Sequence, residues 1–457
     1  MPSKEKLNKI ILIFGDIFIF YTALFLTLII RFQSWPEEKI WQPHLLPFSI
    51  LFVLWLLIFY ITGLYDLKKF ISFKELRSVL IRTMALAGGL AILLFYLVPF
   101  FGITPKTNLV LDIGIALGLL IIWRRFFFIK LLKAEKIKLL FFGLTKETAG
   151  FASFLNQNPQ IGYETAAVMK LPEEDENAFE SGVPILEFDH NIVSLIKEKG
   201  VSLIVASSSI KENKELIRMF YEVLPLGITI IDFPRFYEGL TGKVPVSLIN
   251  EVWFLENLTE LDKYIFEIIK RWFDVVFSLF LAVPAFLIAP FAALLIKLES
   301  PGPVFYSHKR VGKNGRIFEI VKFRSMKADA ETNGARWAKE NDSRITAAGR
   351  FLRKTRIDEL PQLWNVLKGE LSLIGPRPER PEFTETLKKE IPHYAMRHLV
   401  KPGLSGWAQI NFPYGASKED AMEKLQYDLF YIKNRSLTLD LDIFLKTLAT
   451  VIRHQGR

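Results

Sequence analysis

The chain contains 457 residues, which is long enough for two or three domains. Its hydrophobic content of 51% and its positive mean hydropathy exclude an ordinary soluble protein and predict membrane segments. The absence of Cys excludes disulfides and thiolate metal sites and suits a cytoplasmic catalytic face. A net charge of +10 favours an anionic partner. In so apolar a chain we expect membrane lipid and phosphates as partners, and no nucleic acid.

Four apolar stretches near the N-terminus each have about the length that spans a bilayer. They cover residues 9–30, 45–65, 79–100 and 107–128. Lys and Arg concentrate before the first stretch, between the second and third, and after the fourth, so both ends of the bundle are expected in the cytoplasm. The first stretch is too long for a cleaved signal peptide. Residues 1–134 are therefore predicted to form a four-helix transmembrane domain, in which Asp16 and Asp112 receive no assigned role.

From about residue 137, short β runs alternate with helical segments, which is typical of a small doubly wound α/β domain. The expected strands are 137–143, 166–169, 201–206 and 228–233, and the expected helices are 147–157, 189–199 and 211–223. The turn at Gly143 lacks the three glycines of a dinucleotide-binding loop. A Rossmann-like domain over residues 135–235 is therefore expected to bind NAD(P) weakly or not at all, with a regulatory ligand as the alternative.

A fifth apolar stretch, residues 273–296, follows a predicted linker at 236–262 and an amphipathic helical start at 263–271. It is long enough to span a bilayer but contains Pro284 and Pro290, which remove helical hydrogen bonds. Basic residues flank it on both sides, so we expect a re-entrant helix that enters the membrane and turns back. The alternative is an ordinary kinked fifth span. Residues 263–457 are predicted to form an α+β catalytic domain.

A basic segment follows the fifth apolar stretch. Eight His, Lys and Arg residues lie within twenty positions: His308, Lys309, Arg310, Lys313, Arg316, Lys322, Arg324 and Lys327. Such a cluster is usually a solvated face, and beside a membrane it also suits anionic headgroups. It could equally attract a nucleotide diphosphate. His308, His393 and His398 match no compact metal motif and are expected in surface or structural roles.

The acid pair Asp358-Glu359 precedes an apolar run at helical spacing. Because Pro361 suits the first turn of a helix, Asp358 is predicted to be its N-cap, where free N–H groups and the helix dipole keep a carboxylate ionised. Farther on, the stiff turn Gly375-Pro-Arg-Pro378 would hold Arg377 toward phosphate oxygens. By itself such an acid pair is more often a cap and its solvated neighbour.

Four motifs in order give that pair more weight: Lys-Phe-Arg-Ser-Met (322–326), Asp-Glu-Leu-Pro-Gln (358–362), Gly-Pro-Arg-Pro (375–378) and Lys-Pro-Gly-Leu-Ser-Gly-Trp-Ala-Gln (401–409). Together they resemble the bacterial sugar transferase family, the monotopic phosphoglycosyl transferases that act on polyprenyl phosphate. The resemblance covers about residues 268–457. The full layout is similar to the large members that prime exopolysaccharide or O-antigen assembly.

The resemblance implies that Asp358 attacks the sugar-linked phosphate of a UDP-sugar, releases UMP and forms a covalent phosphosugar ester. Polyprenyl (undecaprenyl) phosphate would then accept the sugar phosphate. Glu359 would orient the nucleophile or assist proton transfer, and a Mg²⁺ ion is expected with Asp358 as its protein ligand. The expected substrate-binding residues are Lys322, Arg324, Arg377, Lys401, Trp407 and Gln409. The family works at the cytoplasmic face of the bacterial inner membrane, and a homo-oligomer stays open.

Two departures from the family pattern affect details. Position 287, where many members break the apolar helix, is Leu, with Pro284 and Pro290 a turn to either side. The Phe412-Pro-Tyr414 stretch replaces a more common turn and bears on sugar choice. Two rival functions are a membrane sensor with an inactive catalytic segment, and a polytopic transferase with its site among spanning helices. The intact acid pair opposes the first rival, and the scarcity of acids in the spans opposes the second.

Overall fold

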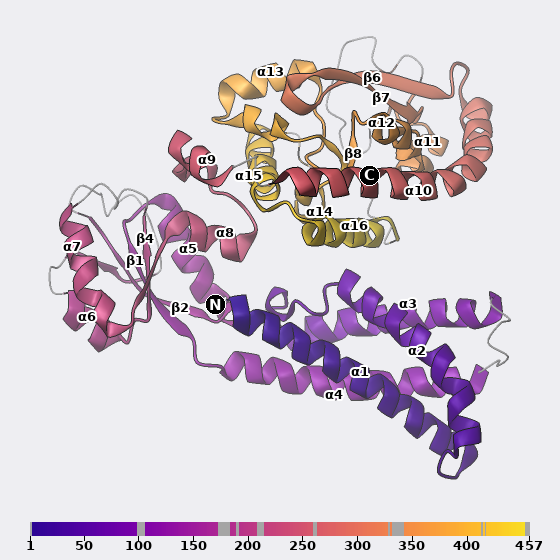
Figure 1. The fold of residues 1–457 in the computed structure, drawn as a ribbon, viewed down its shortest axis with the longest axis horizontal. Coiled ribbons are helices and arrows are strands. Elements are labelled where there is room, and N and C mark those ends of the chain that lie inside the picture. The colour runs from indigo at the N-terminus through magenta and orange to yellow at the C-terminus, as the bar shows by residue number, and fades with distance from the viewer. Residues whose placement is uncertain are drawn as a thin grey trace. The chain divides into compact units, whose positions relative to one another are not determined.

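The computed structural model describes residues 2–97, 106–171, 183–188, 192–207, 214–258, 263–327, 330, 342–412, 415 and 417–452. The chain forms two compact units, Met1–Ile231 and Asp232–Arg457, and each is described by itself below. Figure 1 shows their helices and strands. The end of the predicted apolar stretch 79–100 and the predicted starts of helices 189–199 and 211–223 fall in the gaps between these ranges.

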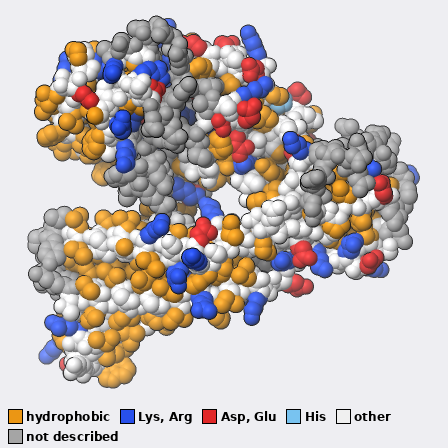
Figure 2. All heavy atoms as spheres, turned by 180° about the vertical axis from the view of Figure 1, so that it is seen from behind, with side chains coloured by type: hydrophobic (Ala, Val, Ile, Leu, Met, Phe, Trp, Pro, Cys, Tyr) orange, Lys and Arg blue, Asp and Glu red, His pale blue; other side chains and the backbone are white. Residues whose placement is uncertain are grey.

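The first unit begins with four long helices that coincide with the four predicted apolar stretches. They are α1 (Pro2–Phe32), α2 (Glu38–Ile61), α3 (Phe73–Leu97) and α4 (Lys106–Lys133). Aromatic side chains such as Phe20 and Trp55 fill the bundle interior, while other large apolar side chains stay exposed on its outer surface (Figure 2). By length and composition, α1, α2 and α3 could each cross a membrane. Helix α4 instead buries Asp112 and Arg124, and Arg124 pairs with Asp16 of α1 at 2.5 Å.

The α/β part of this unit is a five-stranded sheet in the order β3-β2-β1-β4-β5. Its elements are β1 (Ile137–Phe142), α5 (Lys146–Gln157), β2 (Tyr163–Met169), β3 (Ile185–Leu186), α6 (Ile192–Lys199), β4 (Leu203–Ala206), α7 (Lys214–Val223) and β5 (Thr229–Asp232). Strand β1 pairs in parallel with β2 and β4, as the alternating pattern predicted. The two-residue β3 is too short to leave a sequence signal. At the end of β1, Gly143 has a φ of +94°, and Thr145 begins α5 in a capping box with Thr148.

The second unit begins with segments that were expected to be a linker. Residues 236–258 contain most of α8 (Phe233–Thr241), a 3₁₀ turn at Val246–Leu248 and α9 (Glu251–Asn257). Val244, Val246 and Phe254 are buried in the same core as the catalytic segment. Glu238 accepts hydrogen bonds from Lys433 and Asn434 at 2.7 and 2.8 Å. This stretch is therefore folded onto the unit that follows it.

One long helix, α10 (Tyr264–Glu299), joins the amphipathic start and the fifth apolar stretch. It is long and apolar enough to cross a membrane. It continues without interruption through Pro284, Leu287 and Pro290, and Figure 1 shows it bending toward β6 at its far end. Prolines bend helices in this way because they remove backbone hydrogen bonds. Lys270 and Asp274 near its start, and Ala292 and Ile296 near its end, are buried.

The rest of the second unit is a mixed set of short strands and helices packed on α10. An antiparallel hairpin, β6 (Phe305–Val311) and β7 (Ile317–Phe323), leads to α11 (Ala347–Lys354), the 3₁₀ helix η10 (Ile357–Gln362) and α12 (Leu363–Lys368). A parallel pair, β8 (Ser372–Ile374) and β9 (Gly403–Ser405), brackets α13 (Pro381–Glu390) and η11 (Tyr394–Leu399). The chain closes with α14 (Trp407–Asn411), α15 (Lys418–Asn434) and α16 (Leu437–Ile452). The acid pair thus lies between β7 and the core of α12, β8 and α15.

Candidate active site

The acid pair lies in a tight turn that differs from the predicted one. Asp358 is not an N-cap: it lies inside the first turn of η10, one residue after Ile357. The residue that begins this helix is Arg356, whose φ of +59° reverses the chain after α11. Pro361 has no N–H to donate, and the segment forms 3₁₀ geometry before α12 begins at Leu363. The tight turn buries Asp358 and Glu359.

Glu359 is the anionic centre of a cluster of cations. Its Oε1 accepts from Arg377 Nη2 at 2.9 Å and Lys322 Nζ at 3.3 Å, and Arg356 Nη1 lies 3.5 Å away. Burial alone would raise the pKa of Glu359, but Arg377, Lys322 and Arg356 hold it well below its usual range. Glu359 is therefore a permanent carboxylate that fixes three basic side chains and does not carry a proton at neutral pH.

Asp358 has the opposite electrostatic character. It is 6% exposed, and among the described residues its Oδ1 has no hydrogen-bond partner. Burial and the adjacent charge of Glu359 raise the pKa of Asp358 to about 6, while Lys322, Arg353 and Arg356 oppose the rise. A buried carboxylate oxygen without a donor is costly unless a ligand satisfies it. Asp358 is thus ionised at neutral pH and only weakly stabilised by the residues around it.

The β6–β7 hairpin supplies one wall of basic side chains. In its register Tyr306 lies opposite Lys322, so Tyr306, His308 and Arg310 share a face with that lysine. Arg310 Nε donates to His308 Nε2 at 2.8 Å, which requires an unprotonated acceptor nitrogen. Burial, followed by Arg310 and Lys322, lowers the pKa of His308 to about 2. His308 therefore stays neutral within this basic wall.

His308 and Arg310 were not among the predicted site residues. Alternation along β6 would have placed them on one face, but nothing in the sequence showed that this face carries Lys322. Arg310 is also fixed by the Pro378 carbonyl and Glu379, which ties the hairpin to the Gly-Pro-Arg-Pro turn. The cluster thus depends on pairing between segments about seventy residues apart.

Arg377 is held forward by a second layer of buried charge. Arg397 Nη2 donates to the Arg377 carbonyl at 2.9 Å and lies 2.8 Å from Asp428 of α15. Arg397 Nη1 also donates to Tyr394 at 2.6 Å. Burial alone would lower the pKa of Arg397, but Tyr394 and Asp428 raise it, so this guanidinium stays charged. The stiff turn predicted from the prolines is therefore locked by an ion pair that sequence spacing did not reveal.

Arg324 lies apart from this cluster. Its Nη1 and Nη2 donate to the carbonyls of Pro301 and Ser300 at 2.9 and 2.6 Å. Those carbonyls belong to the turn that ends α10, so Arg324 fastens the apolar helix to β7. In a regular strand residues 322 and 324 would share a face, but Arg324 follows the last residue of β7, Phe323, and its side chain is held at the end of α10.

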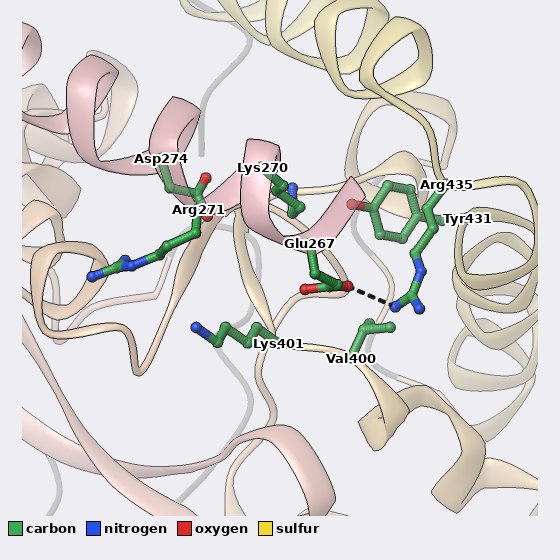
Figure 3. A pocket seen from close by; sticks show the side chains of 8 residues that line it. All are labelled: Glu267, Lys270, Arg271, Asp274, Val400, Lys401, Tyr431 and Arg435. Carbon is green, nitrogen blue, oxygen red and sulfur yellow. Dashed lines mark ion pairs between the residues drawn. The ribbon is translucent and has the colours of Figure 1, made fainter. Parts of the chain in front are cut away.

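The predicted residues of the last motif also lie elsewhere. Trp407 stacks on Phe430 with ring centroids 5.5 Å apart and donates to the Gly242 carbonyl at 2.8 Å. Gln409 donates to the Leu404 carbonyl at 3.2 Å. These contacts make both residues part of the packing around β9. Lys401 lines a separate pocket at the start of α10 (Figure 3). Pro413 and Tyr414 are outside the described residues.

A divalent cation would find only part of its ligand set in the protein. Among the described residues there is no group of three or more His, Asp or Glu side chains placed to hold a metal. The unpartnered Oδ1 of Asp358 fits one metal ligand, whereas Glu359 is already surrounded by cations. Mg²⁺ is commonly bound through one or two carboxylates with phosphates completing its shell. The donor set therefore fits Mg²⁺ only together with a phosphate-bearing substrate.

The site combines one buried carboxylate, Asp358, with basic side chains that are held by a second carboxylate, Glu359. Lys322, Arg356 and Arg377 carry the positive charge, and Arg310 and Arg353 add to it. Such a set stabilises phosphate oxygens and the charge that moves between them during phosphoryl transfer.

Known families match both units of the chain. A model described as bacterial sugar transferase matches residues 265–454, and one described as a CoA-binding domain matches residues 60–234. The first covers every residue of the cluster around Glu359. The second covers the α/β sheet together with α3 and α4.

Curated relatives point the same way. A UDP-N-acetylgalactosamine-undecaprenyl-phosphate N-acetylgalactosaminephosphotransferase of Aeromonas hydrophila is 46% identical over 230 residues, 50% of this chain and 53% of that protein. A UDP-glucose:undecaprenyl-phosphate glucose-1-phosphate transferase of Xanthomonas campestris is 31% identical over 322 residues, 68% of this chain and 65% of that one. A putative undecaprenyl-phosphate N-acetylgalactosaminyl 1-phosphate transferase of Bacillus subtilis is 56% identical over 130 residues, 28% of this chain and 72% of that one.

The matched regions span about half to two thirds of the length of the first two relatives. The third relative is matched over more than two thirds of its length. The chain belongs to the bacterial sugar transferase family.

Proposed function

We propose that this protein is an enzyme that transfers a sugar 1-phosphate from a UDP-sugar to undecaprenyl phosphate and releases UMP. The observation that carries the proposal is the contrast within the acid pair: Asp358 keeps an unpartnered buried oxygen, while Glu359 gathers Arg377, Lys322 and Arg356. The relatives named for the same reaction support it. By the same likeness, the transfer would be the first membrane step of polysaccharide assembly.

The proposed reaction has two displacements at one phosphorus. The Asp358 carboxylate attacks the sugar-linked phosphorus, a P–O bond to the aspartyl oxygen forms, and the bond to the UMP oxygen breaks with its electron pair. An oxygen of undecaprenyl phosphate then attacks that phosphorus and releases the Asp358 carboxylate. Both leaving groups depart as anions, so neither step requires a proton from Glu359.

Each residue of the cluster has a definable part in these steps. Asp358 must be ionised, and with a pKa of about 6 it loses its proton just below neutral pH. Lys322, Arg356 and Arg377 are oriented by Glu359 and would neutralise the diphosphate oxygens. His308 stays neutral and can hydrogen-bond an oxygen without adding charge. Bound between Asp358 and the phosphates, Mg²⁺ would supply further charge neutralisation.

The donor sugar is proposed from the relatives. The two relatives that are 46% and 56% identical are named for N-acetylgalactosamine, whereas relatives named for glucose are 31–42% identical. UDP-N-acetylgalactosamine is therefore the first donor to test. The positive flanks of the apolar stretches support a location in the bacterial inner membrane with the catalytic unit on the cytoplasmic side, where UDP-sugars are made.

The test uses membranes that contain the full chain, undecaprenyl phosphate and a panel of UDP-sugars, with released UMP as the readout. Asp358→Asn is expected to abolish both UMP release and protein-bound sugar phosphate, because an amide cannot act as the nucleophile. Glu359→Gln is expected to be severely impaired while it still accumulates some adduct. Glu385→Gln, which removes an exposed carboxylate on α13, is the matched control. UMP release at the wild-type rate by Asp358→Asn would show that the covalent step is wrong.

A further inference from the structure

A second concentration of charge lies at the start of α10, apart from the acid pair. Its pocket is lined by residues of α10, by Val400 and Lys401, and by Tyr431 and Arg435 near the end of α15 (Figure 3). None of the charges that act most strongly on Asp358 or Glu359 lines it. Four basic side chains face only two carboxylates: the basic ones are Lys270, Arg271, Lys401 and Arg435, and the carboxylates are Glu267 and Asp274.

Three of the four cations are already occupied by the protein. Lys270 pairs with Asp440 of α16 at 2.5 Å, and Arg435 pairs with Glu267 at 3.1 Å. Arg271 donates to the carbonyls of Val366 and Leu367, both at 2.6 Å, at the C-terminal end of α12. Cations suit that end of a helix because its carbonyls are otherwise unsatisfied.

Lys401 is the exception. Within the described ranges its Nζ has no hydrogen-bond or ion-pair partner, although the side chain is half-buried. Asp274, the pocket's other carboxylate, is engaged by Ser372 Oγ at 3.1 Å and the Leu373 N–H at 3.0 Å. Burial first, and then Arg271, lower the pKa of Lys401, while Asp274 and Glu267 oppose the fall. Lys401 is therefore a half-buried cation near a like charge, and within the described residues no carboxylate is in direct contact with its Nζ.

Gly369 sets the distance between the two cations. It ends α12 with a φ of +84°, and a Cβ placed on it would lie 3.5 Å from Arg271 Nη2 and 3.6 Å from Lys401 Nζ. The two nitrogens therefore approach the same point on the glycine. In Figure 3 both side chains extend to one side of the pocket, whereas Glu267 points toward Arg435. Two cations converging where no side chain intrudes form a site for a small anion.

Apolar side chains that do not line the pocket are exposed on the same turns of α10. Along the same turns of α10, Tyr264, Ile265 and Trp272 are each about 70% exposed, and Ile268 and Ile269 are partly exposed. A site for a free anion needs no such surface, whereas a lipid presents a phosphate and hydrocarbon together. We propose that Lys401 and Arg271, at Gly369, bind the phosphate group of a membrane lipid in a site distinct from the acid pair. If that lipid is the acceptor, the inference rests on the proposed function, and the site would hold it before transfer.

The experiment measures lipid binding and needs no donor sugar. Full-length protein in neutral phosphatidylcholine nanodiscs is titrated with undecaprenyl phosphate, with phosphatidylglycerol, or with inorganic phosphate, and bound lipid is counted by native mass spectrometry. Lys401→Gln is expected to weaken binding of one of the two lipids by about tenfold, and Lys401→Arg to restore it. The lipid that responds identifies the source. Lys368→Gln removes an exposed lysine of α12 and is the matched control.

Each outcome decides the proposal. The proposal is supported if Lys401→Gln weakens lipid binding, Lys401→Arg restores it and Lys368→Gln leaves it unchanged. This holds for either lipid. Equal binding of both lipids by wild type and Lys401→Gln would overturn it, as would a response to inorganic phosphate alone. Lipid binding is measured without turnover. A protein that releases no UMP could therefore still bind lipid at this site, and an active enzyme could fail to bind lipid here.

Discussion

Replacing Glu359 and replacing Asp358 by their amides should have opposite effects on stability, although the two residues are adjacent. Glu359→Gln removes the carboxylate from three cations at 2.9, 3.3 and 3.5 Å and leaves them facing one another. Removing one member of a buried ion pair costs about 3–5 kcal/mol in free energy of unfolding. The Arg377 side chain is 32% exposed, so water screens part of this loss and the lower end, about 3 kcal/mol, is expected.

Asp358→Asn should cost nothing or stabilise the protein. Among the described residues nothing donates a hydrogen bond to its Oδ1, and the amide ends the repulsion from Glu359. A loss of 3 kcal/mol in a unit of this size lowers the melting temperature by about 6–12 °C. Differential scanning fluorimetry of the purified protein in detergent should therefore show Glu359→Gln far below wild type and Asp358→Asn at or above it. Equal decreases in the two variants would refute the assignment of opposite roles.

The same pair predicts how these differences change with pH. The pKa of Glu359 is depressed in the fold, so its stabilisation is complete above the unfolded value of about 4.3 and disappears only as pH falls through the lower folded value. The difference in melting temperature between wild type and Glu359→Gln should thus persist at pH 5. The pKa of Asp358 is raised from 3.8 to about 6, so its favourable contribution is complete below 3.8 and is lost as pH rises through 6. The free energy of unfolding of Asp358→Asn should therefore rise relative to that of wild type as the pH increases from 3.8 to about 6.

Three further outcomes follow from the structure. The single-turnover rate of adduct formation should fall about tenfold for each pH unit below 6, because protonated Asp358 is not a nucleophile; a pH-independent rate from 5 to 8 would contradict this. Cys placed at Tyr264 and Lys297, exposed positions near the two ends of α10 in a chain without Cys, should be labelled from the same side of sealed vesicles; labelling from opposite sides would exclude a re-entrant helix. Calorimetry of the full chain with NAD(H) should show no micromolar binding, since the turn after β1 has one glycine of the usual three; a micromolar dissociation constant would refute that reading.

The order of elements was predictable because it follows from periodicity and length. The apolar stretches predicted α1 to α4, and the alternation of strand and helix segments predicted the parallel pairing around β1. The folded segment at 236–258 was not predictable, since its glycines resemble a linker and its burial comes from contacts with distant Gln426 and Lys433.

The residue types of the site could be predicted from the motifs, but which of their side chains meet in space could not. Asp358, Glu359, Lys322 and Arg377 meet as the motifs suggested, whereas Arg324, Trp407 and Gln409 are engaged in packing and backbone contacts. Closeness in a motif does not fix where a side chain points, because β7 ends at Phe323, before Arg324, and a lysine or arginine side chain is several ångströms long. His308 and Arg310 joined the cluster only through the register of the hairpin.

The end of α10 is joined to the segment that carries the acid pair at more than one point. Glu299, its last residue, accepts from the N–H groups of Ala347 and Ala348 at 2.6 and 2.7 Å, and so caps α11. A Cβ on Gly349 would lie 1.9 Å from the Ser325 carbonyl oxygen, so α11 is pressed directly on the strand end beside Arg324. Helix α11 leads within a few residues to Asp358. Because these contacts join the end of α10 to α11, we expect a change in bilayer thickness that tilts α10 to shift Asp358 as well.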